Sequence, residues 1–249
     1  AISAAVERGR RKGQHIVTTA IEHDAVLNTV RFLEEEGWEI VRLEPDSNGQ
    51  ISPEQVLEAV NERTVRVSMM AVNNEVGSIL PVGSVCRQLD YRTIASRVKE
   101  IAPNATVHCD AVQAWCKEPL RLGKNPDVDL MSVSGHKIYA PKGIGALYVK
   151  KGSRLRPVSF GGGQEKNIRP GTEGIANACA MGLAAELLMD EREENHKRVS
   201  EIRQMLLDGL TKLPDICINS PADGTPYILN FSALGVRSEI MLHFLEEKG

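Results

Sequence analysis

The stretch DLMSVSGHK, residues 129–137, sets an apolar strand directly before a serine, a glycine, a histidine and a lysine. Other short apolar segments alternate with helical patterns on both sides of it. Together, the predicted strands cover residues 15–19, 39–43, 65–70, 106–109, 129–133 and 144–149. Because parallel strands joined by helices form a sheet that is buried on both faces, the sequence predicts an α/β fold with a mainly parallel sheet sandwiched by helices.

Helical patterns lie between these strands. Ser52 and Gln55 have the spacing of a capping box, and Pro53 stands at the first helical position between them. Longer helical patterns occupy residues 1–12 and 81–101. These helices are the expected covers of the sheet.

The last part of the chain has a different organisation. Residues 175–213 read as one long helix, which is followed by a strand over 227–231 and a helix over 238–248. We therefore expect a large domain over residues 1–190 and a partial, smaller α+β domain over residues 191–249.

The composition is that of an ordinary globular protein. The chain has 249 residues, of which 42% are hydrophobic and 25% are charged, and the net charge is −3. No apolar run approaches the roughly 18 residues that a membrane helix needs. We expect no general attraction to nucleic acid and no association with a membrane.

The five cysteines stand at scattered spacings, without a C-x-x-C pair. They are Cys86, Cys109, Cys116, Cys179 and Cys217. This pattern favours neither a zinc site nor a disulfide framework, so no metal site is predicted and burial is expected for each cysteine. Free cysteines suit a reducing compartment, and a cytoplasmic location is expected.

Among the polar residues that follow predicted strands in the sequence, Lys137 is the most informative about function. Ligands of open α/β sheets bind at the carboxyl ends of the strands, and Lys137 follows the Ser-Gly-His of residues 134–136 there. Burial disfavours the charged form of a lysine, and a neutral amine can attack a carbonyl and form a Schiff base. The alternative is a lysine on a surface loop.

Asp110 and Gln113 follow the strand predicted over residues 106–109. A carboxylate at Asp110 could keep a pyridine nitrogen protonated, which turns the ring into an electron sink. Alternatively, Asp110 could cap a helix over residues 111–116. Gln113 could bind a phenolic oxygen on the same ring, or it could be an exposed helical residue.

Ser134, His136 and Thr172 offer hydrogen-bond donors to a phosphate group. Thr172 comes shortly after the glycine triplet at 161–163, which is flexible enough for a loop that crosses to a partner subunit. His23, which follows the first predicted strand, could stack on an aromatic cofactor or could have a structural role.

These motifs resemble those of the cysteine desulfurases, a class V aminotransferase family of pyridoxal phosphate enzymes with fold type I. The resemblance covers nearly the whole chain, in the family's order. The matching stretches are TAIEH (19–23), VNNEVG (72–77), HCDAVQ (108–113), DLMSVSGHK (129–137), GGGQE (161–165) and RPGTE (169–173).

The resemblance implies the cofactor pyridoxal 5′-phosphate and a role for each candidate residue. Lys137 would form the Schiff base with the cofactor. His23 would stack on the ring and help to move protons, and Asp110 would pair with the pyridine nitrogen. Gln113 would bind the ring hydroxyl, and Asn74 would lie against the cofactor.

By the same resemblance, Ser134 and His136 would bind the phosphate, and Thr172 would reach it from the other subunit of a homodimer. The implied reaction converts L-cysteine to L-alanine and leaves the sulfur on an enzyme cysteine as a persulfide. The sulfur would then pass to an acceptor protein, such as an iron–sulfur scaffold. It could also be used in thio-cofactor assembly or in tRNA thiolation.

Some parts of the family pattern are not found in the chain. A glycine-rich phosphate loop is expected before Ala1, and the nucleophilic cysteine loop and the arginine for the substrate carboxylate are expected after Gly249. We therefore expect a fragment that lacks both ends and forms no sulfide alone. Cys116 stands where the family more often has glycine.

Two other functions remain open at this point. The first is a selenocysteine lyase or another class V aminotransferase, which shares several of the same motifs. The second, of a different class, is an inactive fragment that serves as a scaffold or a partner-binding module.

Overall fold

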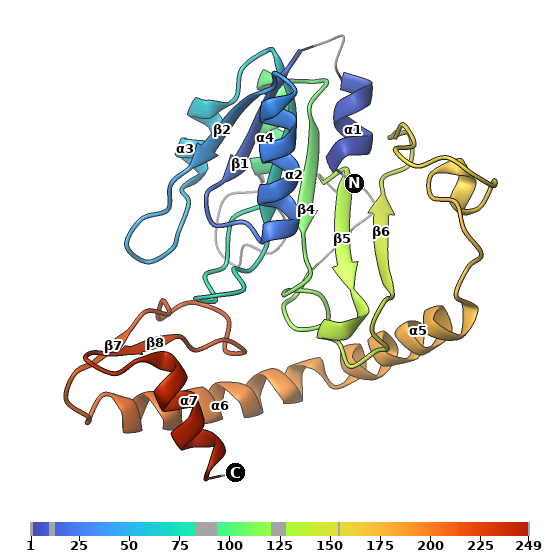
Figure 1. Ribbon diagram of the computed structural model, residues 1–249. Helices are drawn as coiled ribbons and strands as arrows, with labels where there is room; N and C mark the ends of the chain where they lie inside the picture. The colour runs from blue at the N-terminus through green and yellow to red at the C-terminus, as the bar shows by residue number, and fades with distance from the viewer. Residues whose placement is uncertain (1, 10–12, 83–93, 121–127, 154, 249) are drawn as a thin grey trace.

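The computed structural model describes residues 2–9, 13–82, 94–120, 128–153 and 155–248. Within these ranges, the main sheet has six strands in the order β2-β1-β3-β4-β5-β6 (Figure 1). They are β1 (His15–Thr19), β2 (Glu39–Leu43), β3 (Thr64–Met70), β4 (Thr106–Asp110), β5 (Leu130–Ser134) and β6 (Gly145–Val149). The strands from β1 to β5 are parallel, and β6 runs antiparallel to β5.

Helices α1 (Ile2–Gly9) and α2 (Asp24–Glu35) cover one face of this sheet. Val6 and Val30 are fully buried there, in one apolar cluster with Ile16 of β1. The helical spacing of apolar residues along α2 thus points its buried side at the sheet.

Helices α3 (Pro53–Ala59) and α4 (Ile94–Ile101) contribute to the apolar cluster on the opposite face. Val56 of α3 and Val98 of α4 are fully buried in it, together with Val67 of β3. Helices therefore lie on both faces, and the predicted fold class is confirmed.

The predicted start of α3 is also confirmed. Ser52 Oγ accepts a hydrogen bond from the Gln55 N–H at 3.1 Å, and Gln55 Oε1 accepts one from the Ser52 N–H at 2.8 Å. Of the helix predicted over residues 81–101, the structure shows the part from Ile94 onward, because residues 83–93 lie outside the described ranges.

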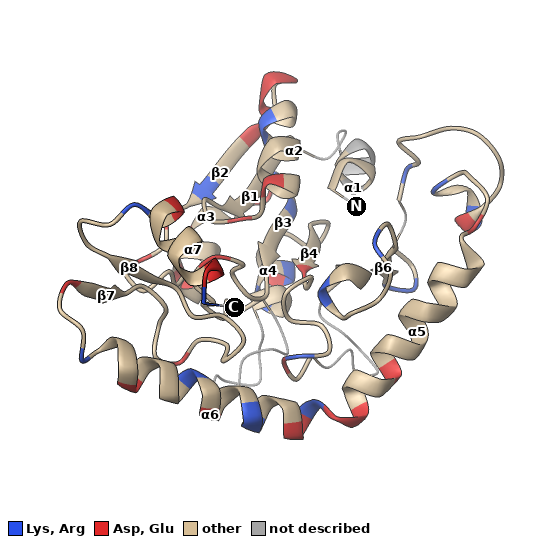
Figure 2. Cartoon of the chain, turned by 60° about the horizontal axis from the view of Figure 1, so that its bottom comes forward, with Lys and Arg blue, Asp and Glu red and all other residues tan. Residues whose placement is uncertain are grey.

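The single long helix predicted over residues 175–213 is wrong. The chain forms α5 (Ile175–Asp190) and α6 (Arg192–Leu210), which are separated at Glu191 by a backbone ψ of 0°. Lysine and arginine alternate with acidic residues along α6 (Figure 2). The domain boundary near residue 190 stays a prediction.

A second, two-stranded sheet pairs β7 (Ile216–Ile218) with β8 (Phe231–Ala233) in antiparallel orientation. The strand predicted over residues 227–231 is therefore wrong, except at its last residue. The segment that precedes β8 bonds to the loop after β3 instead, and the Thr225 N–H donates to the Gly77 carbonyl at 2.9 Å.

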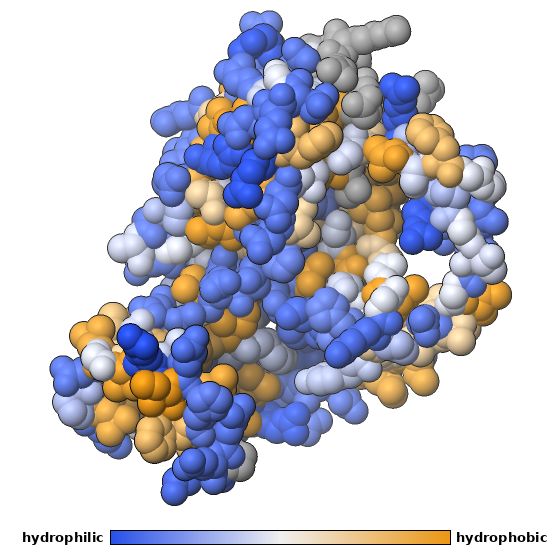
Figure 3. Space-filling view, in the orientation of Figure 1, coloured by the Kyte–Doolittle hydropathy of each residue, from blue (hydrophilic) through white to orange (hydrophobic). Residues whose placement is uncertain are grey.

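The last helix, α7 (Ser238–Glu246), lies where it was predicted. Its Leu242 and Phe244 are exposed, and apolar residues gather on the surface over β7, β8 and α7 (Figure 3). Leu183 and Leu187 of α5 are exposed as well. None of the described helices combines the length and the apolar content that a membrane span requires.

Candidate functional site

The carboxyl ends of β1, β3, β4 and β5 carry most of the predicted site residues. These strands are parallel neighbours in that order, so their carboxyl ends share one edge of the sheet. Asp110 is the last residue of β4, and Ser134 is the last residue of β5. His23 follows β1, and Asn74 follows β3. The fold therefore brings four separate segments of the chain to a common edge.

Lys137 ends η1 (Gly135–Lys137), a short 3₁₀ turn that directly follows β5. A Cβ atom at Gly135 would lie 2.7 Å from Cγ2 of Ile144 and 3.1 Å from Cβ of Ala140, so the turn depends on glycine. The Lys137 side chain is half-buried. Burial, and then the charge of Lys137, lower the pKa of Lys117 in the turn after β4.

The Asp110 carboxyl is half-buried, and its Oδ1 accepts the Val112 N–H at 3.0 Å. Burial raises the pKa of Asp110, whereas this hydrogen bond and the charge of His23 oppose the shift. A cation held against the carboxylate would offset the cost of burial. Pairing with a protonated ring nitrogen would satisfy Asp110 in this way, and that role stays a prediction.

The segment after Asp110 does not form the helix that was one of the two alternatives for this residue. Residues 112–117 form turns and not the helix that Asp110 could have capped. Gln113 is half-buried in this turn. Its predicted bond to a ring hydroxyl stays a prediction.

His23 is exposed and is the N-cap residue of α2. Its Nδ1 accepts the Ala25 N–H at 3.1 Å, so the neutral imidazole carries its proton on Nε2. The capping bond holds the ring at the sheet edge and leaves Nε2 available.

Glu22 lies in the TAIEH stretch beside His23, and the sequence analysis gave it no role of its own. It is 4% exposed, and its Oε1 accepts the Thr19 hydroxyl and the Met70 N–H, each at 2.8 Å. Its Oε2 is buried and has no hydrogen-bond partner among the described residues. Burial raises the pKa of Glu22 to about 8, and the charge of Asp110 adds to this shift against the two hydrogen bonds. The sequence signal for Glu22 was a glutamate that follows a buried strand within three residues and directly precedes His23.

Ser134 and His136 are joined by a hydrogen bond of 2.7 Å between Oγ and Nδ1. With a neutral imidazole, this bond uses one of the two donor hydrogens, so the pair presents one donor to an anionic group, and a protonated imidazole would leave two; binding of the phosphate stays a prediction. Thr172 is exposed on the loop between η2 (Glu165–Asn167) and α5. Figure 1 shows this loop on the β6 side of the sheet, and its contact with a partner subunit stays a prediction.

The turn that carries Asn74 is held by its neighbour. Asn73 Oδ1 accepts the N–H groups of Glu75 and Val76 at 2.9 and 2.8 Å. Asn74 is half-buried beside this pair of bonds. The turn therefore fixes the backbone from which Asn74 projects.

The cysteines near the site are not activated thiols. Burial raises the pKa of Cys116 to about 11 and raises that of Cys109 as well, so neither is a ready thiolate. Burial is confirmed for these two and is wrong for Cys179 and Cys217, which are exposed. Cys86 lies outside the described residues.

Cys116 has an unusual backbone conformation. Its φ of 62° lies in the left-handed region, which glycine adopts most easily. This agrees with the glycine that the family resemblance led us to expect there.

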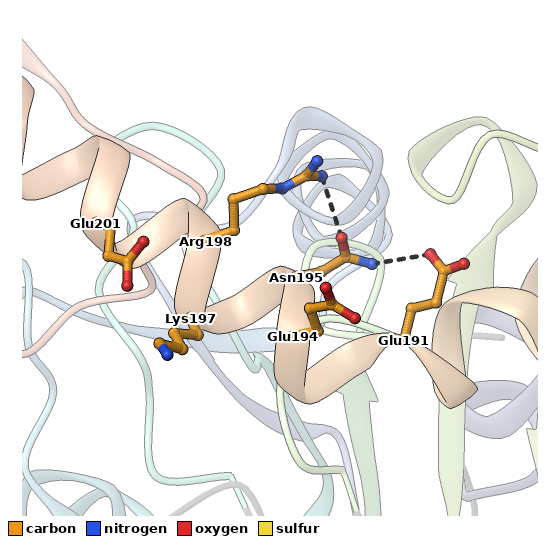
Figure 4. Close-up of a pocket in the computed structure, with 6 residues that line it drawn as sticks. All are labelled: Glu191, Glu194, Asn195, Lys197, Arg198 and Glu201. Carbon is orange, nitrogen blue, oxygen red and sulfur yellow. Dashed lines mark hydrogen bonds between the residues drawn. The ribbon is translucent and has the colours of Figure 1, made fainter.

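An open, polar pocket lies on α6. It is lined by Glu191, Glu194, Asn195, Lys197, Arg198 and Glu201 (Figure 4). Asn195 donates to Glu191 at 3.3 Å and accepts from Arg198 at 3.1 Å. The pocket contains none of the predicted site residues. Across the described ranges, no cluster of histidine, cysteine, aspartate or glutamate could hold a metal ion.

The chain is similar to known proteins over its whole length. The family model "Aminotransferase class-V" matches residues 1–249. "Cysteine desulfurase IscS" of Clostridium botulinum (strain Hall) is 36% identical over 256 residues, and the match covers 100% of this chain and 61% of that protein. The chain therefore spans about three fifths of the length of this relative.

Solved structures show the same arrangement. A "NIFS-LIKE PROTEIN" superposes with a TM-score of 0.91 at 34% identity, over 100% of this chain and 65% of that one. A protein described as "SspA in complex with cysteine" superposes with a TM-score of 0.75 at 31% identity, over 98% of this chain and 64% of that one.

Proposed function

The chain belongs to the class-V aminotransferase family, and from this membership we propose that the protein is a cysteine desulfurase dependent on pyridoxal 5′-phosphate. The observation that carries the proposal is the position of His23, Asp110 and Lys137 at the carboxyl ends of β1, β4 and β5, on one edge of the sheet. An amine, a carboxylate and an imidazole at one sheet edge form the set that a pyridine aldehyde requires.

The residues present fit this cofactor. Burial raises the pKa of the half-buried Asp110 despite the opposing charge of His23, and Oε2 of the neighbouring Glu22 is buried without a partner among the described residues. Both observations suit a polar, cationic ring at this edge. When bound, the cofactor supplies an electron sink for the bonds at the substrate Cα.

Each residue has a task that follows from its own contacts. Lys137 would hold the cofactor aldehyde through its amine, and the same amine, when free, would act as a base. Asp110 would keep its carboxylate against the ring nitrogen. His23, whose Nδ1 is engaged by Ala25, would hold or deliver a proton at Nε2.

Five further residues, one of them from a second copy of the chain, would orient the cofactor. Gln113 would donate to the ring hydroxyl, and Asn74 would lie against the ring. Ser134 and His136, already 2.7 Å apart, would bind the phosphate, and Thr172 of a second copy would complete the phosphate site in a homodimer.

The overall reaction would take L-cysteine and an enzyme thiol to L-alanine and an enzyme persulfide. The carbon–sulfur bond of the substrate breaks, a sulfur–sulfur bond forms, and the thiol proton passes to the alanine product. The similarity to a protein solved with cysteine supports this substrate. We propose an iron–sulfur scaffold, or a partner in tRNA thiolation or thio-cofactor assembly, as the sulfur acceptor, and a cytoplasmic location in view of the unpaired cysteine spacing.

The test compares substrates in the full-length protein supplied with pyridoxal phosphate. Formation of alanine and persulfide from L-cysteine, dependent on Lys137, is the expected result. A much higher turnover of selenocysteine than of cysteine would favour a selenocysteine lyase instead. Failure of the protein to bind the cofactor at all would favour a scaffold role.

A further inference from the structure

The segment between β7 and β8 touches two loops of the candidate site. In Figure 1 this segment lies beside the lower end of the main sheet, where the loop after β3 descends. One of its residues, Thr225, bonds to both the loop after β3 and the turn after β4. No sequence motif pointed to Thr225.

The first bond is made by the Thr225 backbone. Its N–H donates to the carbonyl oxygen of Gly77 at 2.9 Å. Gly77 has a φ of +78°, and a Cβ atom on it would lie 3.2 Å from Cγ2 of Thr225. Gly77 also donates to the Asn73 carbonyl and so closes the turn that contains Asn74. Thr225 therefore rests directly against the Asn74 turn.

The second bond is made by the Thr225 side chain. Its hydroxyl donates to Oε1 of Glu118 at 2.6 Å, and the two residues are 1% and 2% exposed. The Glu118 N–H donates to the Ala114 carbonyl at 2.8 Å, and the Trp115 N–H donates to the Ala111 carbonyl at 2.9 Å, so these overlapping bonds form one turn over residues 111–118 that contains Gln113. A hydrogen bond to a buried acid is stronger than an exposed one, because water cannot replace it.

A neighbouring contact supports the same attachment. Nζ of Lys117 lies 5.8 Å from the ring centroid of Tyr227, and the Tyr227 ring packs edge-on against His196 of α6. The turn after β4 is thus attached to the segment by both an acid and a cation. Asn230 Nδ2 donates to the Glu75 carbonyl at 3.2 Å and adds a further tie to the Asn74 turn.

We infer that Thr225 is a positioning residue that fixes the Asn74 turn and the Gln113 turn relative to each other. This inference rests on the proposed function, because both turns carry predicted cofactor residues. Thr225 touches neither the cofactor nor the substrate in this account. It acts through Gly77 and Glu118.

Hydrogen exchange, measured without cofactor, tests the inference independently of the proposed function. Thr225→Val keeps the side-chain shape and removes the hydroxyl. We expect faster amide exchange, by about tenfold, in the peptides that cover residues 71–78 and 111–118. Thr64→Val is the matched control, because Thr64 is also 1% exposed, bonds His15 Nδ1 at 2.8 Å, and stands at the opposite edge of the sheet.

The control should accelerate exchange near residues 60–64 and leave both site turns unchanged. Equal acceleration by the two variants throughout the chain would show that Thr225 contributes general stability, and the inference would be wrong. Wild-type exchange in the two turns of Thr225→Val would overturn it as well. Neither result depends on whether the protein binds pyridoxal phosphate.

Cofactor affinity supplies the functional measurement. We expect Thr225→Val to weaken pyridoxal phosphate binding by about tenfold, and Thr225→Ser, which keeps the hydroxyl, to stay within about twofold of the wild type. Binding by Thr225→Val at wild-type strength would contradict the positioning role. Wild-type protein that binds no cofactor, with both turns still loosened in Thr225→Val, would refute the proposed function and leave the mechanical link between the turns intact.

Discussion

The carboxyl group of Glu22 accepts a hydrogen bond of 2.8 Å from the backbone N–H of Met70. Met70 is paired with Asp110 across β3 and β4, so the Glu22 carboxyl lies beside the strand end that carries Asp110. Two acids therefore share this edge of the sheet, and they differ in burial. Glu22 is almost fully buried, whereas Asp110 is partly open. Glu22 thus holds a proton under conditions in which exposed glutamates are ionised.

The free energy of unfolding should fall as the pH rises, because burial raises the pKa of Glu22. Its pKa rises from 4.5 in its ordinary state to about 8 in the fold, so between these values the folded chain binds a proton that the unfolded chain does not. The stabilisation is complete below about pH 4.5 and is lost as the pH rises towards about 8, at roughly 1 kcal/mol per pH unit. Glu22→Gln, which stays neutral, should remove this slope in urea unfolding measured across that range.

Glu44→Gln is the control for this titration, because Glu44 is exposed at the end of β2. It should keep the wild-type slope. A Glu22→Gln variant with the wild-type pH dependence would mean that Glu22 is ionised in the folded chain.

Replacing Lys137 by alanine should abolish covalent attachment of pyridoxal phosphate. The amine is the only group in the proposed mechanism that can bind the aldehyde, so borohydride reduction should add no mass to Lys137→Ala and its visible absorption band should be missing. Lys142→Ala, at an exposed lysine a few residues further on, should trap the cofactor as the wild type does. Trapping at wild-type yield in Lys137→Ala would refute the assignment.

Asp110→Asn should slow turnover more than it weakens cofactor binding. An asparagine can still accept the Val112 N–H, but it has no charge to stabilise a protonated ring nitrogen, so kcat should fall by about 100-fold or more. Asp46→Asn is matched, because Asp46 Oδ1 also accepts an N–H two residues ahead, from Asn48 at 2.8 Å. Equal kcat values for both variants would exclude the predicted role of Asp110.

The left-handed backbone conformation of Cys116 should decide which substitutions the fold tolerates at this position. Cys116→Gly relieves about 1–2 kcal/mol of backbone strain and loses about the same from burial and chain entropy, so its free energy of unfolding should change by less than about 1 kcal/mol. Cys116→Val keeps the strain and adds a β-branch, and it should destabilise by more than about 2 kcal/mol in the same urea experiment. The reverse order would show that packing, not backbone strain, dominates at this position.

The order of strands and helices could be predicted because each strand is a short apolar run bounded by polar or glycine-rich residues. The placement of Asp110, Ser134 and Lys137 followed from the same pattern, because the carboxyl ends of parallel strands meet at one edge. Local sequence therefore contains both the sheet and most of its candidate site.

Features that depend on distant contacts could not be predicted. The helix breaks at Glu191, although neither glycine nor proline stands there. Thr225 forms hydrogen bonds with Gly77 and Glu118, which are both far from it in the sequence. The burial of Glu22 was also hidden, because glutamate is among the residues least often buried. In each case the sequence contains the residue, and the fold alone supplies its partner.

The amino end of β3, where Thr64 and His15 are joined, faces away from every candidate residue. The nearby Glu62 is exposed in the preceding turn. A dye, an affinity tag or a tether to a glass surface attached at Glu62 would therefore sit at the far rim from the reacting groups. Single-molecule recordings of a protein anchored there could follow the carboxyl edge of the sheet, which carries the candidate residues, without obstructing it.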